Sequence, residues 1–387
     1  MATRDPDGLT RLVARLREAG YTATALHDRL GLTYPDDVGL LNHAAALERV
    51  AGDRSAAATL IRLFFLEAAE PSRSVAALFR RRDHKDLVSS GVLHERGGET
   101  RARVRIDPIG DQYFAADRRF RALDARALRL SGRDPVYPPS SDSLLLRDAI
   151  VAPEARRALD VCTGSGIQAL QRARTVERVI AVDINARAAA IARFNAQLNG
   201  VDNVEVRSGD LYAPVRDQQF DLIIANPPFV SSPYATGPAY HAGGPTGDRV
   251  LRRIIGGWGK HLRPEGRAFA ISHLAVRRGE DVQSIAARWF SRFPGRALVL
   301  VLETGTPIDL AAAQALFALE KGLTAYAAEV RRWVDYLRRQ RIAAVSLLLL
   351  VAARDARAGV DVVDAHPRVL PLPLTPGPAD RIAAWLQ

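Results

Sequence analysis

Cysteine is almost absent from this sequence, since Cys162 is the only one among 387 residues. A single cysteine excludes an intramolecular disulfide framework and a cysteine-rich metal site. The sequence also lacks an apolar run long enough to cross a bilayer, because the longest, 342–353, has the length of a strand or a short helix. The opening stretch, MATRDPDGLTRL, is charged and contains no apolar segment of the signal-peptide kind. We therefore expect a cytoplasmic protein without a membrane partner.

Lysine is scarce as well: only three of the 54 basic residues are lysines, yet the formal net charge is +11. Such an excess favours an acidic partner such as nucleic acid, although the arginine bias is also what a GC-rich genome produces. Residues 1–117 carry 17 basic and 17 acidic side chains, so the whole surplus follows them. Basic clusters occur at 118–133 and 330–341, and each fits either an RNA-binding surface or an ordinary solvated helix face.

The N-terminal region, 1–117, is predicted to be a separate domain. Residues 8–84 contain amphipathic stretches of helical period, the first of which ends at Gly20. The segment DHKDLVSSGVLHERGGETRARVRIDP, residues 83–108, then indicates a short helix and two strands around a Gly-Gly turn. This pattern suggests a winged helix. Such modules bind DNA in some proteins and serve as dimerisation or substrate platforms in others, and the neutral charge of this region disfavours DNA binding.

From about residue 118 the pattern changes to alternating strands and helices, which predicts an α/β domain over 118–355. The expected architecture is a seven-stranded, doubly wound Rossmann-like sheet. A proline-rich extension, 356–387, ends in a last short helix. The strand-like runs are 158–163, 178–184, 203–209, 220–226, 267–272, 297–303 and 343–353.

A glycine turn and two later acids suggest a nucleoside site. LDVCTGSGIQAL places Gly164 and Gly166 between a strand and a helix, where they permit a tight turn. Asp183 ends the next strand, and its two carboxylate oxygens suit the hydroxyls of a ribose. No third glycine follows in step, so a ligand without a pyrophosphate, such as S-adenosylmethionine (SAM), fits best. The predicted cofactor-binding residues are Asp160, Thr163, Gly164, Ser165, Gly166, Asp183, Ile184, Asn185, Asp210, Leu211 and Asn226.

The fourth predicted strand ends in Asn226-Pro227-Pro228-Phe229. Taken alone, this could be only a stop signal, because proline cannot donate to a sheet ladder. After the glycine turn, Asp183 and Asp210, the order resembles the class I SAM-dependent methyltransferases that modify planar nitrogens. Their substrates include adenine N6, cytosine N4, guanine N2 and the glutamine amide of peptide release factors.

Two further stretches resemble the archaeal–eukaryotic branch of the PrmC/HemK glutamine methyltransferases. They are DPVYPPSSDSLLLRDAI, residues 134–150, and the segment from Asn226 through an Ala-Gly-Gly-x-x-Gly loop. The resemblance covers roughly 134–275. Phe229 stands where that branch usually has tyrosine, and Ser140–Ser141 replace its usual Ala-Glu. The N-terminal region and the C-terminal extension have no counterpart in the small members.

The resemblance implies catalysis without a general base. The Asn226 side-chain oxygen and the Pro227 carbonyl would accept hydrogen bonds from the target nitrogen and stabilise its developing charge. Pro228 would stiffen the turn, and Phe229 would stack on the planar group. His241 and His273 are the histidines nearest in sequence, and a structural or loop-lining role is favoured for both.

Three functions remain open at this point. The favoured one is N5-methylation of a protein glutamine, with a release factor as partner. The alternative is methylation of an exocyclic amine in ribosomal or transfer RNA, or in DNA, which the basic surplus and the winged helix favour. A non-catalytic SAM-binding scaffold is disfavoured by the intact Asn226-Pro227-Pro228-Phe229. No metal is expected, and the oligomeric state is open.

Overall fold

The computed structural model describes residues 6–119, 135–151, 155–234, 243–365 and 377–386. The chain forms two compact units. The first unit contains Met1–Ser141, Gly164–Leu170 and Ala186–Val204. The second unit contains Asp142–Thr163, Gln171–Asn185 and Glu205–Gln387. Each is described by itself.

The first unit opens with short amphipathic helices around an aromatic core. Leu9, Leu12 and Leu16 are buried on one face of the first helix, as the apolar spacing predicted. The core they enter also contains Tyr21 and Phe64. The helices are α1 (Pro6–Glu18), α2 (Ala23–Leu30), η1 (Pro35–Asp37), α3 (His43–Ala51) and α4 (Ala56–Leu60), which continues into the π-helical turn η2 (Ile61–Phe65).

The next elements have the order and pairing of a winged helix. They are β1 (Glu70–Pro71), α5 (Ser72–Ala76), α6 (Arg81–Ser89), β2 (Leu93–Arg96) and β3 (Glu99–Ala102). The three strands pair antiparallel in the order β1-β3-β2. Gly97 and Gly98 join β2 to β3 at positive φ, +61° and +81°, where side chains are disfavoured.

A buried hairpin completes this unit, formed by β4 (Arg105–Ile109) and β5 (Gln112–Ala116). Helix α9 (Ala186–Leu198) packs against β5. The Arg105–Asp107 ion pair within β4 is fully buried, and the Arg105 guanidinium lies 4.0 Å from the centre of the Phe65 ring. Burial raises the pKa of Asp107, while Arg105 opposes that rise. A buried pair of this kind is costly to break because the remaining charge would be unpaired.

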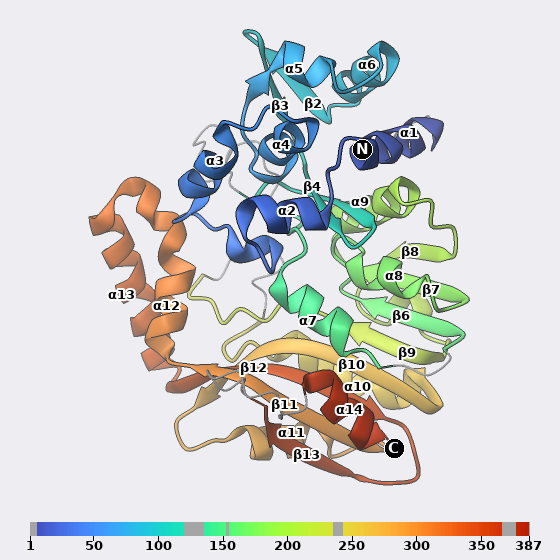
Figure 1. Ribbon diagram of the computed structural model, residues 1–387. Helices are drawn as coiled ribbons and strands as arrows, with labels where there is room; N and C mark the ends of the chain where they lie inside the picture. Colours follow the sequence, from blue (N-terminus) through green and yellow to red (C-terminus); the bar gives the residue numbers. More distant parts are fainter. Residues whose placement is uncertain (1–5, 120–134, 152–154, 235–242, 366–376, 387) are drawn as a thin grey trace. The chain divides into compact units, whose positions relative to one another are not determined.

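The second unit is built on an eight-stranded sheet of order β13-β11-β12-β10-β9-β6-β7-β8 (Figure 1). Strand β12 runs antiparallel to both its neighbours, whereas β10, β9, β6 and β7 pair in parallel. The strands are β6 (Arg157–Val161), β7 (Arg178–Asp183), β8 (Val204–Ser208), β9 (Phe220–Ala225), β10 (Leu262–Arg277), β11 (Arg296–Gly305), β12 (Ile342–Ala353) and β13 (Gly359–Asp364).

The eighth strand is one more than the sequence predicted. It is β13, which pairs in parallel with β11 and lies in the segment expected to be an extension. Its edge position explains why it was missed, because its burial is only partial and acidic residues interrupt its valines. The central strands were predicted because strands covered on both faces read as continuous apolar runs.

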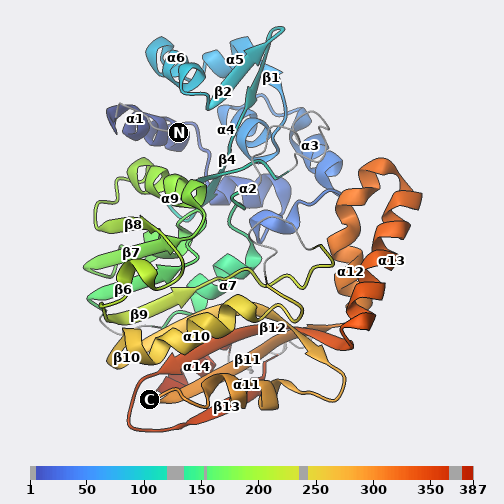
Figure 2. The same cartoon turned by 180° about the vertical axis from the view of Figure 1, so that it is seen from behind.

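Helices cover both faces of this sheet. Figure 2 shows α10 (Arg249–His261) and α11 (Val282–Phe290) in front of the strands, whereas α14 (Pro378–Leu386) lies on the opposite face in Figure 1. A helical hairpin is inserted between β11 and β12, formed by α12 (Pro307–Ala315), η7 (Leu316–Lys321) and α13 (Leu323–Arg339). The remaining elements are α7 (Ser141–Ala149), α8 (Ile167–Arg172) and η5 (Ala213–Val215). None of the described helices has the length and apolar character that spanning a membrane requires.

Candidate active site

The first group of predicted residues follows β6. Asp160 is buried at the end of this strand, and its carboxylate accepts a hydrogen bond from the Thr163 hydroxyl. The Thr163 amide donates to the Val182 carbonyl at 3.1 Å, which ties this loop to the end of β7. Cys162 between them has φ +62°, a left-handed conformation that is rare outside glycine. A strained residue at the end of a central strand marks a loop whose shape is fixed by its surroundings.

Three predicted acids converge around Cys162. Burial raises the pKa of the Cys162 thiol well above its usual value, and the carboxylates of Asp183, Asp160 and Asp210 raise it further. The Gly209 amide donates to the Asp183 carbonyl at 2.9 Å, so the loops after β7 and β8 are joined. The carboxyl ends of three neighbouring strands therefore gather negative charge at one edge of the sheet.

Asp183, Ile184 and Asn185 form a turn after β7. The Asn185 amide donates to Asp183 Oδ1 at 2.8 Å, which fixes one carboxylate oxygen by a local Asx turn. Ile184 leaves 67% of its surface exposed. An isolated exposed isoleucine beside an acid offers an apolar contact for the edge of a ligand.

Asp210 is engaged by α10. Arg253 Nη2 lies 2.6 Å from Asp210 Oδ2, and this hydrogen bond is the main reason that the pKa of Arg253 is raised. Leu211, the next residue, has φ +48°. One oxygen of the Asp210 carboxylate is therefore engaged within the protein.

The glycine turn belongs to the first unit. Gly164 and Gly166 both have positive φ, +57° and +87°. A Cβ on Gly166 would lie 3.2 Å from the Ala192 Cβ of α9, whereas one on Gly164 would meet nothing within 4 Å. The Ser165 carbonyl accepts a hydrogen bond from Asn195 Nδ2 at 2.8 Å. Close helix packing thus requires glycine at 166, and the side of Gly164 stays open.

Asn226 follows β9 and is held by the start of α7. Its Nδ2 donates to Asp142 Oδ2 at 2.9 Å and approaches Ser143 Oγ at 3.4 Å. The amide nitrogen is therefore engaged by the protein, and the amide oxygen Oδ1 is the atom left to accept a hydrogen bond from a ligand. Pro227 is buried behind it, and Pro228 is half-buried.

Phe229 stacks on His273 of β10, with ring centres 4.8 Å apart and an angle of 10° between the rings. Burial lowers the pKa of His273, so its neutral form is favoured against the phenyl ring. Two glycines of the Ala-Gly-Gly-x-x-Gly loop approach the Phe229 backbone. A Cβ on Gly247 would lie 2.4 Å from the Phe229 carbonyl oxygen, and one on Gly243 would lie 2.7 Å from its carbonyl carbon. The position of Phe229 therefore depends on glycine at both places.

The chain beyond Phe229 is anchored by the inserted helical hairpin. The Tyr234 hydroxyl donates to Glu329 of α13, and Trp333 Nε1 donates to the same carboxylate oxygen at 3.0 Å. Glu329 is buried, although it is charged, because these two donors satisfy it. The insertion between β11 and β12 thus holds the segment that follows the Asn-Pro-Pro-Phe turn.

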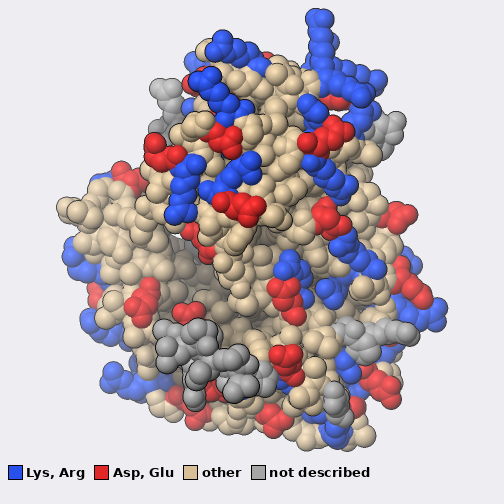
Figure 3. Space-filling model, viewed as in Figure 1, with Lys and Arg blue, Asp and Glu red and all other residues tan. Residues whose placement is uncertain are grey.

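The two predicted basic clusters have different outcomes. Residues 120–133 and His241 lie outside the described residues. The cluster at 330–341 falls on α13 and the turn after it, and its exposed members include Arg331 and Arg339. Acidic and basic side chains are interspersed over most of the face drawn in Figure 3.

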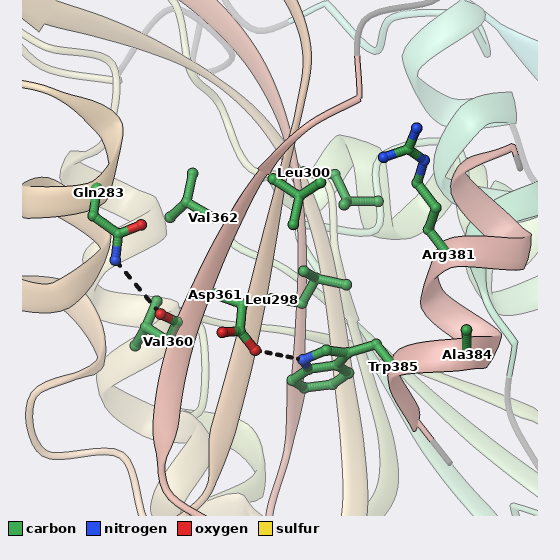
Figure 4. A pocket seen from close by; sticks show the side chains of 10 residues that line it. Gln283, Leu298, Leu300, Val360, Asp361, Val362, Arg381, Ala384 and Trp385 are labelled. Carbon is green, nitrogen blue, oxygen red and sulfur yellow. Dashed lines mark hydrogen bonds between the residues drawn. The ribbon is translucent and has the colours of Figure 1, made fainter. Parts of the chain in front are cut away.

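A groove of about 560 Å³ lies elsewhere in the second unit, by β11, β13 and α14 (Figure 4). Trp385 Nε1 donates to Asp361 across it at 2.9 Å, and Arg296 donates to the last carbonyls of α14. No residue of the predicted site lines it. Within the described part of the chain, no group of three or more His, Cys, Asp or Glu side chains is arranged to hold a metal ion.

Sequence reasoning missed three contributors to this arrangement. Asp142 and Ser143 lie in the segment that carried the family resemblance, but neither was assigned a role. Asn195 gave no usable signal, since it acts through Ser165, 30 residues away in the sequence. His273 was singled out and given a structural role, and it stacks on Phe229.

Two family models match the chain. Residues 140–278 match the methyltransferase small domain. Residues 18–103 match a domain of unknown function, DUF7059.

Curated proteins similar to this chain share one kind of name. A "ribosomal protein uL3 glutamine methyltransferase" of Bordetella pertussis is 30% identical over 199 residues, which cover 42% of this chain and 67% of that protein. A "release factor glutamine methyltransferase" of Xylella fastidiosa is 38% identical over 159 residues, covering 38% of this chain and 55% of that protein. A "ribosomal protein uL3 glutamine methyltransferase" of Bradyrhizobium diazoefficiens is 40% identical over 122 residues, which cover 28% of this chain and 38% of that protein. The chain spans about half, or less, of the length of the first relatives it matches.

Proposed function

We propose that this chain, which belongs to the PrmC/HemK-type family of glutamine methyltransferases, transfers a methyl group from SAM to the side-chain amide nitrogen of a protein glutamine. The favoured substrate is a release factor. One observation carries the proposal: Asp142 holds the Asn226 amide by its nitrogen, which commits the Asn226 oxygen to an incoming donor.

Asn226 and Pro227 position the target nitrogen. The lone pair of an amide nitrogen is delocalised, so it must be aimed and partly localised before it attacks a methyl carbon. Asn226 Oδ1 accepts one N–H of the substrate amide, and the Pro227 carbonyl accepts the other. These fixed dipoles also stabilise the positive charge that develops on nitrogen. The methylated nitrogen is strongly acidic and releases its proton to water, so no general base is needed.

Phe229 supplies the surface for the planar amide group. One face of its ring is covered by His273, and this stacking holds the ring in place. The opposite face receives the flat substrate group by stacking. Because residues 243 and 247 are glycines, their loop can lie directly against the Phe229 backbone, and this close contact sets the position of the Phe229 ring. These residues fix the orientation of the substrate amide, and correct orientation supplies most of the rate enhancement at such a site.

The charges at the carboxyl ends of β6, β7 and β8 fit SAM. When bound, SAM supplies an electrophilic methyl group on a cationic sulfonium, and it also carries an ammonium group. The three carboxylates around Cys162, of which Asp160 is buried, form a matching anionic cluster. We propose that Asp183 accepts the ribose hydroxyls, with Ile184 and Asn185 beside it. Leu211 faces the adenine edge, and Asp160 and Thr163 contact the amino-acid portion.

The test is the transfer of label from radioactive SAM to separate purified substrates. A release factor, ribosomal protein uL3, ribosomal RNA and transfer RNA would each be incubated with the full chain. We expect label on a glutamine of the release factor and none on RNA. Label on uL3 alone would mean that the substrate is still a protein, but that it is uL3 and not a release factor. Label confined to RNA would overturn the proposal in favour of an exocyclic base nitrogen.

The matched variant is Asn226→Ala. It should lose at least about 2 kcal/mol of transition-state stabilisation, the scale for one preorganised polar group. Methylation by this variant at the parent rate would contradict the role given to Asn226.

A further inference from the structure

The neutral charge of residues 1–117 hides a segregation of charge. Residues 72–103 carry eight Arg or Lys side chains and four Asp or Glu, whereas the rest of 1–117 carries nine and thirteen. The basic part coincides with the winged-helix elements α5, α6, β2 and β3. The sequence prediction against DNA binding by this region rested on its total charge, and that total conceals a basic segment.

Helix α6 concentrates this charge at its N-terminus. Arg80 is its N-cap residue and makes no side-chain capping bond, and Arg81 and Arg82 follow directly. The N-terminus is the positive end of the helix dipole, so three arginines there oppose the field of the helix. The free protein gains no stability from this arrangement, which becomes favourable when an anion binds there.

The β2–β3 hairpin adds a second basic element beside α6. Its residues alternate, so Leu93, Thr100 and Ala102 point inward and are buried. The outward positions include Arg96 and Arg101, at exposed places on either side of the Gly97–Gly98 turn. Helix α6 packs against β2, so both basic elements belong to one surface. Figure 3 shows basic side chains projecting from the end of the first unit that carries them.

The acids of this segment are paired, two of them with its own arginines: Asp86 lies 3.9 Å from Arg82 and Glu99 lies 3.8 Å from Arg101. Asp83 pairs with Arg11 of α1 at 2.7 Å, and Glu95 lies 3.3 Å from His84. In contrast, the exposed residues Arg80, Arg81, Lys85 and Arg96 form no ion pair with any residue in the described ranges. Four cations on two adjoining elements are thus available to a polyanion.

We propose that this winged-helix surface, residues 70–103, binds the sugar-phosphate backbone of a nucleic-acid duplex through α6 and the β2–β3 hairpin. A helix with its side chains is about 10–12 Å wide, which matches the major groove of B-form DNA. Arginine pairs with phosphate oxygens through two parallel hydrogen bonds, and helix N-termini bind phosphate. The shared ligand chemistry is the phosphodiester backbone, so contact requires no particular base sequence. This binding is independent of the proposed methyl transfer.

The experiment measures binding of the full chain to fluorescein-labelled duplex DNA and duplex RNA of about 20 base pairs by anisotropy. The test variant is Arg80→Gln/Arg81→Gln/Lys85→Gln. The matched control is Arg54→Gln/Arg216→Gln/Arg292→Gln, which removes the same charge at exposed positions outside the winged helix and outside the other basic clusters. We expect the test variant to bind at least about tenfold more weakly, and its slope of log K against log salt to fall by about two to three.

Each result of the anisotropy experiment either supports the proposal or overturns it. Stronger binding of the DNA duplex assigns the surface to B-form DNA, and stronger binding of the RNA duplex assigns it to A-form RNA. Equal weakening by the control variant would overturn the proposal, since it would show only an effect of net charge. Displacement of the duplex by polyglutamate at equal charge concentration would also overturn it. Methyl transfer by the test variant to an isolated protein substrate should be unchanged, so failure here is distinguishable from failure of the proposed function.

Discussion

Asn226 and Asp142 are 84 residues apart in the sequence and joined by a 2.9 Å hydrogen bond between Nδ2 and Oδ2. The bond fixes which end of the Asn226 amide faces a substrate. A carboxylate is suited to this task because it only accepts hydrogen bonds, so the amide cannot flip without losing it. Asp142 is therefore a positioning residue for the proposed reaction.

Asp142→Ala should lower kcat about 10- to 100-fold, because a hydrogen bond to a charged group contributes about 1.5–3 kcal/mol. The SAM dissociation constant and the KM for the protein substrate should change little. Asp142→Asn retains an acceptor oxygen and should recover part of kcat. The control is Asp148→Ala on the same helix, where the exposed carboxylate pairs with Arg147. A parental kcat for Asp142→Ala would remove Asp142 from the mechanism.

Gly247→Ala should displace Phe229. Its φ of +80° is unfavourable for alanine, and the added Cβ would lie 2.4 Å from the Phe229 carbonyl oxygen. We expect a loss of about 1–3 kcal/mol in the free energy of unfolding and a fall in kcat. The control is Gly256→Ala in α10, where a Cβ meets nothing within 4 Å and alanine favours the helix. Urea unfolding and initial rates on both variants check this, and equal stability of the two would contradict it.

Much of the second unit followed from the sequence. Continuous apolar runs identified the central strands, and the order of glycine turn, acids and Asn-Pro-Pro-Phe predicted the candidate site. These signals are local, because each depends on residues close together in the chain. The structure brings Asp160, Asp183 and Asp210 around Cys162. Their assignment as cofactor contacts stays a prediction.

The remaining features depend on contacts between distant parts of the chain. Asp142 reads as an ordinary first-turn acid of α7 until Asn226 lies beside it. His273 was given a structural role from the sequence, and only the fold shows that its partner is the Phe229 ring. The charge of the winged-helix elements was missed for another reason: the sum over 1–117 cancels, and the basic surplus appears only when residues 72–103 are counted separately. Composition gives totals, whereas binding depends on where the charges lie.

Stability should fall as the pH falls from about 7 to 5. Burial is the main cause of a lowered pKa for His43, His261 and His273 in the folded chain. The unfolded chain, with histidine pKa values near 6.5, then binds more protons than the folded one below that pH. The free energy of unfolding therefore increases as the pH rises from about 5 to 7, and it decreases when the solution is acidified through the same range. Urea unfolding midpoints at several pH values measure the slope.

The contribution of His273 can be isolated by His273→Phe, which keeps a ring against Phe229 and removes the titrating group. This variant should show a smaller loss of stability between about pH 7 and 5 than the parent. His27→Gln on α2, where the histidine is exposed, is the control and should keep the parental slope. An unchanged slope in His273→Phe would mean that His273 contributes nothing to the pH dependence.

Asp183→Ala should weaken SAM binding about 10- to 100-fold, because it removes the acceptor proposed for both ribose hydroxyls. Isothermal titration calorimetry with SAM measures this directly, without a protein substrate. Asp183 also accepts the Asn185 amide, so the turn itself could relax in this variant. Asp183→Asn separates the two effects, since it keeps an acceptor for Asn185 and loses the charge. Asp202→Ala, an exposed acid in the loop before β8, is the matched control. If Asp183→Ala and Asp202→Ala bind SAM with the parental affinity, the ribose assignment is wrong and the carboxylates around Cys162 serve another purpose.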